Sequence, residues 1–265
     1  MRIPLFPLSL VLFPGQTIPL HIFEVRYKQM LARCLKEKIP FGIVLIPESG
    51  RWGRGTPRSI GTFARVTQVE EVPDGRCIIP APHNGSCFHI SCFGEGRFRV
   101  SALDRREAEY LVGDVEPYPD EESPPPAMAM VAQRVGLLFD DYYRHLVALM
   151  GGWQKETEPG DRTLLFDMST LVKGQAVLQE GAESPMDKPR RIKVPSLPED
   201  PVALANAVAA ELNVQPDVKQ ELLEAPSALQ RLQREAEILA DETPQMQERL
   251  DQQVRRRFTS FGMSS

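Results

Sequence analysis

The chain has 265 residues, of which 42% are hydrophobic and 25% charged, and its net charge is −5. This composition is that of a globular protein long enough to bury a sizeable core. The acidic balance argues against a general nucleic-acid binder, which needs a basic excess to neutralise phosphates. The four cysteines form no C-x-x-C pair and lie in apolar segments, which favours reduced, buried thiols and a cytoplasmic location. A disulfide between Cys87 and Cys92 would join side chains that point to opposite faces of one strand.

The first strongly apolar segment, IPLFPLSLVLFPGQTIPLHIF (3–23), has the hydrophobicity of a signal peptide or a membrane helix. Four prolines interrupt it, and each removes a backbone donor and blocks a continuous helix: Pro4, Pro7, Pro14 and Pro19. No A-x-A-like cleavage site follows, and a transmembrane helix needs about 20 uninterrupted apolar residues. The segment therefore predicts a strand at 4–13, a type II turn at Pro14-Gly15 and a second strand at 17–23, with no export signal and no membrane span.

Residues 23–38 have the spacing of an amphipathic helix, with a stripe made of Tyr27, Met30, Leu31, Cys34 and Leu35. A loop rich in glycine and arginine is expected at 48–59. Strand-like segments with turn residues between them are expected at 41–47, 61–72, 76–81, 86–93, 96–103 and 109–118. Short strands at this spacing predict a barrel or a sandwich, and we assign residues 1–118 to one β subdomain.

The composition changes at PDEESPPP (119–126), an acidic, proline-rich junction that marks the expected domain boundary. A long helix is expected at 127–150, and residues 151–199 form an irregular insertion. Further helices are expected at 200–213, 215–225, 226–242 and 243–261. Residues 127–242 are thus predicted to form a helical subdomain. Residues 243–265 are predicted to form a helical tail that could pair with a second chain or fold back, so the oligomeric state stays open.

Several motifs in this chain resemble the N-terminal, substrate-binding domain of the Lon protease family. They are PLFPLSLVLFPG (4–15), PLHIFEVRYKQML (19–31), IGTFARV (60–66), GEGRFRV (94–100) and KQELLEAPSALQRL (219–232). Together they follow the family's order over most of the chain. The motif residues, to which we assign structural roles, are Phe13, Pro14, Gly15, Phe23, Glu24, Arg26, Tyr27, Gly61, Arg97 and Phe98. For Glu24, Arg26 and Tyr27, at the junction of a strand and a helix, a role in lining a groove is the alternative.

The resemblance implies an α+β fold, a PUA-like pseudo-β-barrel with one packed helix followed by a C-terminal helical bundle. It also implies a non-catalytic module that binds unfolded or extended polypeptide segments, with an adaptor role beside a protease in protein quality control. Residues 151–199 and the tail past residue 241 are longer than the family pattern requires. The sequence has no G-x-x-x-x-G-K-[ST] phosphate loop and no following protease domain. We therefore expect a stand-alone binding domain that is not an enzyme and uses no ATP, cofactor or metal.

The titratable residues show no spacing typical of catalysis or metal binding. No zinc-site pattern links the four histidines, which are His21, His83, His89 and His145. The most enzyme-like segment is FDDYYRHL (139–146), but on a helix Asp141 and His145 form an ordinary i, i+4 pair. A hydrolase is therefore the weakest of the functional hypotheses.

The candidates for polypeptide binding are Trp52, Arg54, Arg97 and Arg99. Trp52 and Arg54 lie in the loop 50–58, and tryptophan and arginine are common at binding hot spots. The same residue types suit base stacking and phosphate contacts, so an RNA-binding PUA-like protein that uses this loop is the alternative function. A plain solvated loop is the third interpretation. Arg97 and Arg99 flank Phe98 on an expected strand, so both should point away from the core, where they are either solvated or able to hold a chain's carbonyls.

Overall fold

The structure is a computed structural model that describes residues 1–46, 55–72, 87–149, 152–153, 163–166, 190–193 and 195–261. The chain divides into two compact units. The barrel unit comprises Met1–Met128 and Pro198–Arg231, and the helical unit comprises Ala129–Leu197 and Leu232–Ser265. The first stretch of the barrel unit ends at Met128, just after the expected boundary at 119–126, and a later part of the chain also belongs to this unit.

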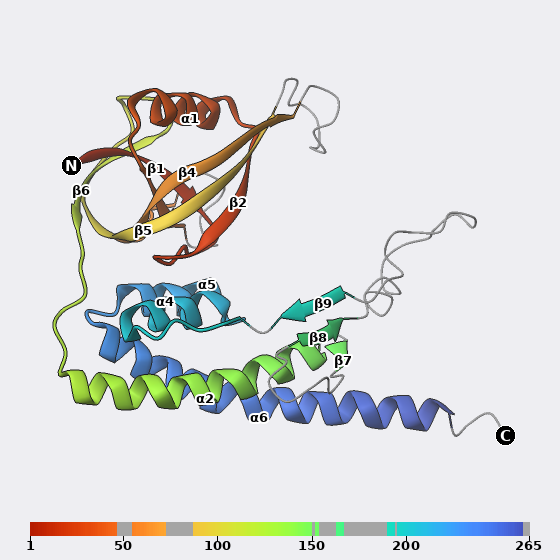
Figure 1. The fold of residues 1–265 in the computed structure, drawn as a ribbon. Helices are drawn as coiled ribbons and strands as arrows, with labels where there is room; N and C mark the ends of the chain where they lie inside the picture. The colour runs from red at the N-terminus through yellow and green to blue at the C-terminus, as the bar shows by residue number, and fades with distance from the viewer. Residues whose placement is uncertain are drawn as a thin grey trace, which may run out of the picture. The chain divides into compact units, whose positions relative to one another are not determined.

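Six strands form the sheet of the barrel unit (Figure 1): β1 (Arg2–Leu8), β2 (Thr17–Ile22), β3 (Phe41–Leu45), β4 (Ile60–Val72), β5 (Cys87–Asp104) and β6 (Leu111–Pro117). Their order is β2-β5-β4-β3-β1-β6, and an additional β5–β6 pairing closes the sheet. The long strand β5 makes this closure possible, because its first part pairs with β2 and β4 and its last part with β6. Strands β1 and β3 are parallel, and the chain between them contains β2 and one helix.

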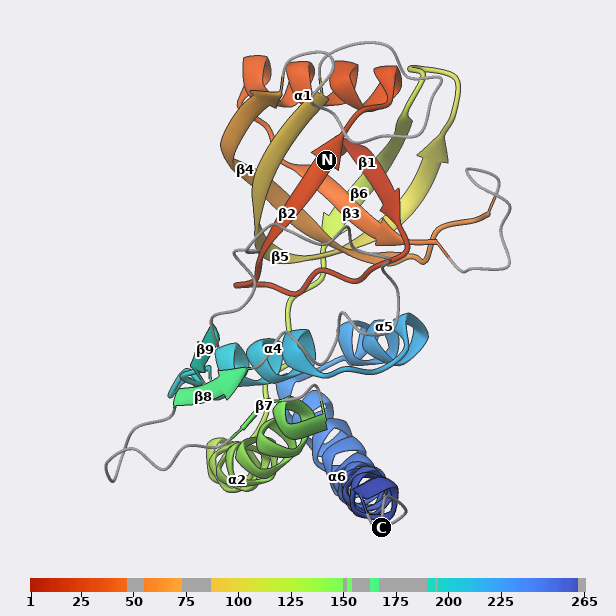
Figure 2. The same cartoon turned by 90° about the vertical axis from the view of Figure 1, so that its right-hand side faces the viewer.

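That helix, α1 (Val25–Glu37), lies across one end of the barrel, as Figures 1 and 2 show. It buries most of its predicted stripe: Tyr27, Met30, Leu31 and Cys34. Leu35, the fifth residue of the predicted stripe, is exposed. The buried face packs in one core with Phe6, Ile22, Phe41, Ile43, Ile90 and Val112. Burial of this apolar face against the strands stabilises the helix more than helix propensity does.

The Phe13-Pro14-Gly15 segment forms the predicted turn. Gly15 has a φ of 83°, as the third position of a type II turn requires, and the Gln16 N–H donates to the Phe13 carbonyl at 3.2 Å. The turn is fastened to β5, since the Gly15 N–H donates to the Gly94 carbonyl at 2.8 Å and the Gly94 N–H donates to the Gln16 carbonyl at 2.9 Å. A Cβ on Gly94 would lie under 3.0 Å from the Phe13 carbonyl oxygen. Two of the sequence motifs, FPG and GEGRFRV, therefore contact each other.

Two strands differ from the prediction. β1 ends at Leu8 instead of at residue 13, because the chain turns into the core, where the Leu12 carbonyl accepts a hydrogen bond of 2.6 Å from the buried Thr62 hydroxyl. The segments 86–93 and 96–103 form one strand, β5, in place of two. The expected strand at 76–81 lies outside the described residues.

Helices α4 (Pro201–Glu211) and α5 (Pro216–Glu224) belong to the barrel unit. Helix α4 begins as predicted, with Pro201 in the first turn and with the Asp200 carboxylate accepting a hydrogen bond of 2.8 Å from the Ala203 N–H. Helix α5 contacts the barrel through Gln220, whose Nε2 donates to the Ile60 carbonyl at 3.0 Å. This bond is one of several contacts that join this late segment of the chain to the N-terminal barrel.

Helices α2 (Pro125–Leu149) and α6 (Ala228–Phe261) supply most of the helical unit. The sequence predicts two helices at 226–242 and 243–261, but α6 runs through Pro244 without a break. A proline removes one backbone hydrogen bond from a helix. The buried side chains of Leu239 and Met246, on either side of Pro244, hold the helix in place, and the Thr243 hydroxyl donates to the Leu239 carbonyl at 2.7 Å.

The insertion 151–199 contains short strands within its described residues: β7 (Gly152–Trp153), β8 (Thr163–Phe166) and β9 (Arg190–Lys193), paired in that order. Helix α2, which the sequence predicts at 127–150, buries Ala132, Val135, Phe139, Tyr142 and Val147. Among the residues that the structure describes, no helix is both long enough and apolar enough to cross a membrane. The fold is therefore the α+β fold expected from the sequence, with the strands first and most of the helices after them.

Candidate functional site

A pocket of about 110 Å³ opens in the barrel unit beside the start of α1. Its apolar lining comes from five places in the chain and consists of Pro7, Tyr27, Ile46, Pro57, Ala108, Tyr110 and Leu111. Gly55 and the charged side chains of Arg26, Arg105 and Glu109 complete the lining. Such a pocket can accept one apolar side chain, while the guanidinium groups offer donors to the carbonyls or carboxylates of the same ligand.

The first wall of the pocket is built by the FE-x-RY motif. The Glu24 carboxylate pairs with the Arg26 guanidinium at 2.7 Å, and this guanidinium lies 4.6 Å from the centre of the Tyr27 ring. Glu24 stands at the N-cap of α1, but its side chain makes no cap hydrogen bond and binds Arg26 instead. Burial raises the pKa of Tyr27, so this phenol stays neutral at physiological pH. The motif thus fixes a guanidinium over an aromatic ring at the edge of the pocket.

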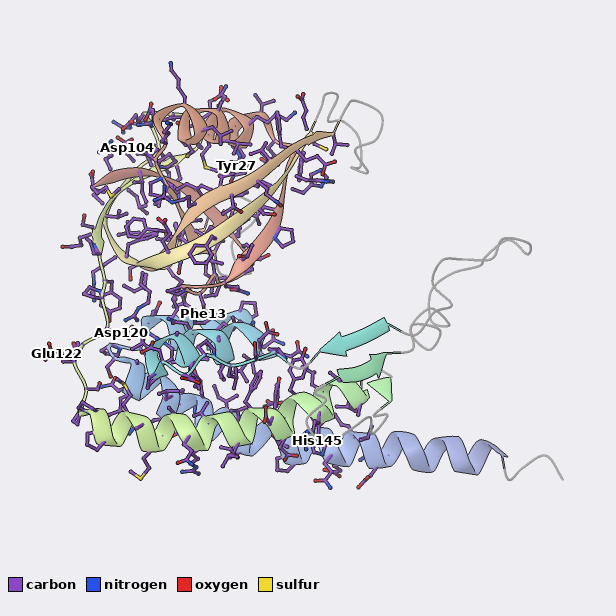
Figure 3. The ribbon with its side chains drawn as sticks, in the orientation of Figure 1. Phe13, Tyr27, Asp104, Asp120, Glu122 and His145 are labelled. Carbon is purple, nitrogen blue, oxygen red and sulfur yellow. The ribbon has the colours of Figure 1, made fainter. Side chains whose placement is uncertain are left out.

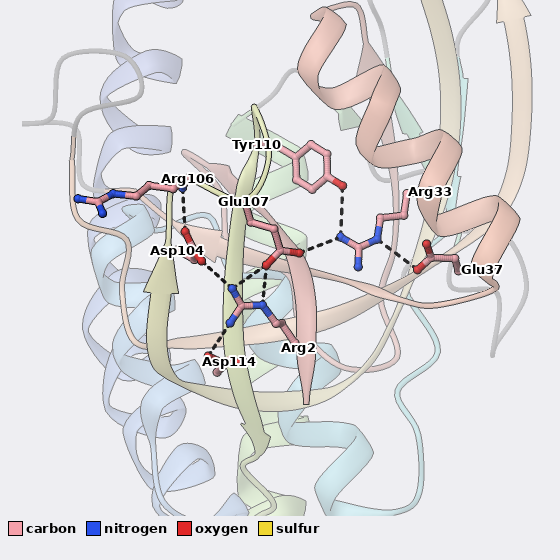
Figure 4. A network of polar contacts seen from close by, with 8 residues as sticks. All are labelled: Arg2, Arg33, Glu37, Asp104, Arg106, Glu107, Tyr110 and Asp114. Carbon is pink, nitrogen blue, oxygen red and sulfur yellow. Dashed lines mark hydrogen bonds and ion pairs between the residues drawn. The ribbon is translucent and has the colours of Figure 1, made fainter.

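The opposite wall is the connection between β5 and β6, which an ion-pair network holds. Figure 4 shows the Arg2 guanidinium between three carboxylates, at distances of 2.6–3.0 Å from Asp104, Glu107 and Asp114. Arg33 of α1 lies 3.6 Å from Glu107 and donates to the Tyr110 hydroxyl at 3.5 Å. These groups are partly exposed, so they add little to the stability of the fold. Their effect is to orient residues 104–110 and, with them, one side of the pocket.

Of the four predicted binding residues, the structure describes Arg97 and Arg99. Trp52 and Arg54 lie outside the described residues. Arg99 is exposed, with its guanidinium 4.7 Å from the centre of the Tyr118 ring. Arg97 lies at the same distance from the Tyr118 ring but is only 6% exposed. Binding of a foreign polypeptide by these residues stays a prediction.

Arg97 donates hydrogen bonds to backbone carbonyls, as the sequence allows, but these carbonyls belong to the protein itself and not to a bound polypeptide. Its Nη1 donates to the carbonyls of Leu223 and Ala225 at the end of α5, at 2.7 and 2.6 Å, and its Nη2 lies 2.9 Å from Asp120. The Asp120 carboxylate, labelled in Figure 3, also forms an ion pair with the guanidinium of the buried Arg231, at 2.9 Å. Burial, and then the charge of Arg231, lower the pKa of Arg97 to about 10. The arginine that alternation predicts to point away from the core thus fastens α5 to the barrel.

Sequence reasoning missed Asp120 and Arg231 as the partners of Arg97. Arg231 also donates to the Asn206 side chain at 3.0 Å and to the Leu222 carbonyl at 3.0 Å. The available signal was the segment 219–232, which contains both Gln220 and Arg231. This segment carries polar contacts of α5 with the rest of the barrel unit, and Asp217, just before it, adds the ion pair with Arg58.

The remaining motif residues are part of the packed structure. Phe13 and Phe98 are fully buried, and Gly61 is the register partner of Phe98. A Cβ on Gly61 would lie under 3.0 Å from the Ile43 carbonyl and from the Phe98 ring, so only glycine fits there. The ring of Phe23 meets His21 edge to face at 5.9 Å.

The enzyme-like segment 139–146 forms the contacts that its spacing predicts. His145 Nδ1 lies 3.6 Å from the Asp141 carboxylate and 2.8 Å from the Asp141 carbonyl on the same helix (Figure 3). Tyr142 is buried against Phe139, with ring centres 6.3 Å apart. These are helix-surface and packing contacts, and they bring no nucleophile and base together.

Comparisons with known proteins place the chain. Residues 2–241 match the family model of the ATP-dependent protease La (LON) substrate-binding domain, and the chain therefore belongs to this family. It is 28% identical over 137 residues to the LON peptidase N-terminal domain and RING finger protein of Schizosaccharomyces pombe. That match covers 42% of this chain and 28% of the yeast protein, so the chain spans well under half the length of this relative.

Two solved structures share the fold. A Lon N-terminal domain protein from Xanthomonas campestris is 22% identical with a TM-score of 0.50, and the match covers 88% of this chain and 96% of that one. The N-terminal domain of the Mycobacterium avium complex Lon protease is 16% identical with a TM-score of 0.55, and the match covers 92% and 98% of the two chains. At these identities the likeness establishes the fold, which is that of a Lon N-terminal domain.

Proposed function

We propose that this chain is a non-catalytic module that recognises unfolded or extended polypeptide segments. The chain belongs to a family that is named for substrate binding, because residues 2–241 match the model of the LON substrate-binding domain. The observation that carries the proposal is the pocket beside α1, with an apolar lining and guanidinium groups at its edge. An unfolded chain offers apolar side chains next to unpaired carbonyls, and the pocket is complementary to that combination.

In this proposal one apolar side chain of the ligand enters the pocket between Tyr27 and Tyr110. Arg105, whose Nη2 donates to the Gly55 carbonyl at 3.2 Å, lies at the edge and turns to a ligand carbonyl. A folded protein hides its apolar side chains and pairs its carbonyls, and so it binds poorly. Selection of unfolded chains follows from the chemistry without any covalent step.

The test is fluorescence anisotropy with a labelled, reduced and carboxymethylated protein as the unfolded ligand and its native form as competitor. Ala108→Trp fills the pocket and Arg105→Ala removes the donor, and each should weaken binding about fivefold or more. Arg65→Ala is the matched control, because Arg65 is an exposed barrel arginine paired with Glu95 outside the pocket. Melting curves verify that the variants fold. The proposal is wrong if the wild type does not bind the unfolded ligand. If both pocket variants bind as the wild type does, the pocket is not the binding site.

We further propose that the chain cleaves nothing and acts as an adaptor for a protease in the cytoplasm. The comparisons match a substrate-binding domain alone, which supports a binding role. Incubation with casein, with and without ATP, should leave the casein intact. Cleavage that survives a second purification step would contradict this part of the proposal.

The RNA-binding alternative makes a different prediction, a steep fall of RNA affinity with salt. Arg58 is the only arginine of the loop 50–58 among the described residues, and its Nη2 pairs with the Asp217 carboxylate at 2.8 Å. A guanidinium that is already paired contributes less to phosphate binding. Absence of an RNA mobility shift at low salt would eliminate this alternative.

A further inference from the structure

Strands β2 and β5 bring together side chains that the sequence keeps far apart. His21 and His89 are register partners, and their ring centres lie 4.6 Å apart in an edge-to-face arrangement. Cys87 is two residues before His89 on β5 and therefore on the same face of the strand. One donor atom from each of the three residues can be chosen so that all lie within 4.8 Å of one another, with His21 Nε2 at 2.9 Å from Cys87 Sγ.

Two imidazoles and a thiolate are the ligands of a borderline-soft divalent cation such as Zn²⁺. Metal bonds of about 2.0–2.3 Å in a tetrahedron place such donor atoms about 3.3–3.6 Å apart. The observed spacings, from 2.9 to at most 4.8 Å, bracket this range. Because the backbone pairing of β2 and β5 already fixes the three residues, small side-chain rotations are enough to reach it.

The electrostatic surroundings also suit a cation. Glu70 of β4 is the register partner of His89 on its other side, so a carboxylate stands on the same face. His89 is exposed, which leaves an entry path from solvent.

Cys87 decides when such a site is complete, because its sulfur is disulfide-bonded in this structure, whereas the sequence favours a reduced thiol. A disulfide sulfur has no negative charge and is a poor ligand for Zn²⁺. We propose that His21, Cys87 and His89 form a binding site for a zinc-type divalent cation that is closed in the disulfide form and opens on reduction. A dithiol supplies the two electrons and two protons and leaves as its own disulfide, while the S–S bond of Cys87 breaks and gives two S–H groups, one on Cys87 and one on its disulfide partner. On metal binding the Cys87 S–H bond breaks, its proton goes to solvent, and a sulfur–metal bond forms.

The proposed site lies apart from the pocket of the proposed function, since the two share no residue. Metal binding and polypeptide binding can therefore succeed or fail independently. The cross-strand pairing also explains why the sequence predicts no metal site, because ligands on different strands have no fixed spacing along the chain.

The experiment is a titration with Co²⁺ of the full chain, once as the disulfide form and once after reduction with dithiothreitol and anaerobic desalting. A cysteine thiolate bound to Co²⁺ gives a charge-transfer band in the near ultraviolet. We expect this band from the reduced protein with one Co²⁺ per chain, its loss on addition of Zn²⁺, and no band from the disulfide form. Mass spectrometry verifies the redox state of each sample.

Three variants separate the site from adventitious binding. His89→Ala changes an exposed residue and should weaken Co²⁺ binding at least about tenfold, and Cys87→Ser should abolish the band although the other three cysteines, Cys34, Cys77 and Cys92, remain. His145→Ala is the control, because this histidine lies on α2 in another unit, and it should bind as the wild type does. Circular dichroism verifies the fold of each variant. The proposal is overturned by a reduced wild type without the band, by an unchanged affinity in His89→Ala, or by equal binding of the disulfide form.

Discussion

Arg97 and Asp120 form an ion pair of 2.9 Å in which the arginine side chain is 2% exposed. Because Arg231 shares the same carboxylate, one anion serves two buried guanidinium groups. A buried charge that loses its only counter-ion destabilises a protein strongly, whereas an intact pair contributes little net stability. Asp120 is therefore the residue on which the polar link between the barrel and α5 depends most.

Asp120→Asn should lower the free energy of unfolding by roughly 3 kcal/mol, since it leaves two guanidinium charges without their shared carboxylate. Urea unfolding followed by circular dichroism measures this loss. Glu122→Gln removes a carboxylate two residues away that is exposed (Figure 3), and it should change stability by less than about 0.5 kcal/mol. Equal stabilities of the two variants would show that Asp120 does not neutralise the arginine pair.

Two glycines of the GEGRFRV motif should respond differently to alanine. In Gly94→Ala the new methyl group would lie under 3.0 Å from the Phe13 carbonyl and would push the FPG turn off β5, whereas nothing lies within 4 Å of a Cβ on Gly96. We expect Gly94→Ala to cost about 2 kcal/mol or more and Gly96→Ala to be nearly neutral. Thermal melting of the two variants side by side tests this, and a larger loss in Gly96→Ala would contradict the contact between the two motifs.

The free thiols should make the protein less stable at high pH. Burial raises the pKa of Cys34 to about 11 and that of Cys92 to about 12. In the unfolded chain these thiols ionise at about pH 8.5. Between that pH and the folded pKa the unfolded state binds fewer protons, so the free energy of unfolding falls as pH rises.

Cys34→Ala isolates this effect from other groups that titrate at the same pH. From pH 8 to pH 10 the wild type should lose roughly 2 kcal/mol more stability than the variant does. Urea unfolding at both pH values gives the difference. A variant that loses as much as the wild type would show that Cys34 ionises in the native state at its ordinary pKa.

The N-cap of α4 offers a local test. Asp200→Ala removes the carboxylate that accepts the Ala203 N–H and should cost about 1 kcal/mol. Glu199→Ala changes the exposed neighbour just outside the helix and should leave stability unchanged. Chemical denaturation of both variants checks the cap, and equal curves for the two would mean that the hydrogen bond adds nothing.

Much of the barrel could be predicted because its signals are local. The positive φ of Gly15 follows from the chemistry of a Pro-Gly turn, and the buried stripe of α1 follows from helical periodicity. The end of β1 at Leu8 could not be predicted, because a hydrogen bond from Thr62, far along the chain, draws Leu12 out of the sheet register. The continuity of α6 through Pro244 could not be predicted either, because it depends on the burial of Leu239 and Met246 on either side of the proline.

The sequence by itself determined the family, the strand and turn chemistry of the first segment and the amphipathic face of α1, since each depends on neighbours along the chain. Only the tertiary structure decided that Arg97 is buried on Asp120 and that His21 faces His89 across two strands. Alternation along a strand determines which face a side chain takes but not what covers that face. Arg97 is covered by a chain segment more than a hundred residues away in the sequence. His21 meets His89 because strands β2 and β5 pair.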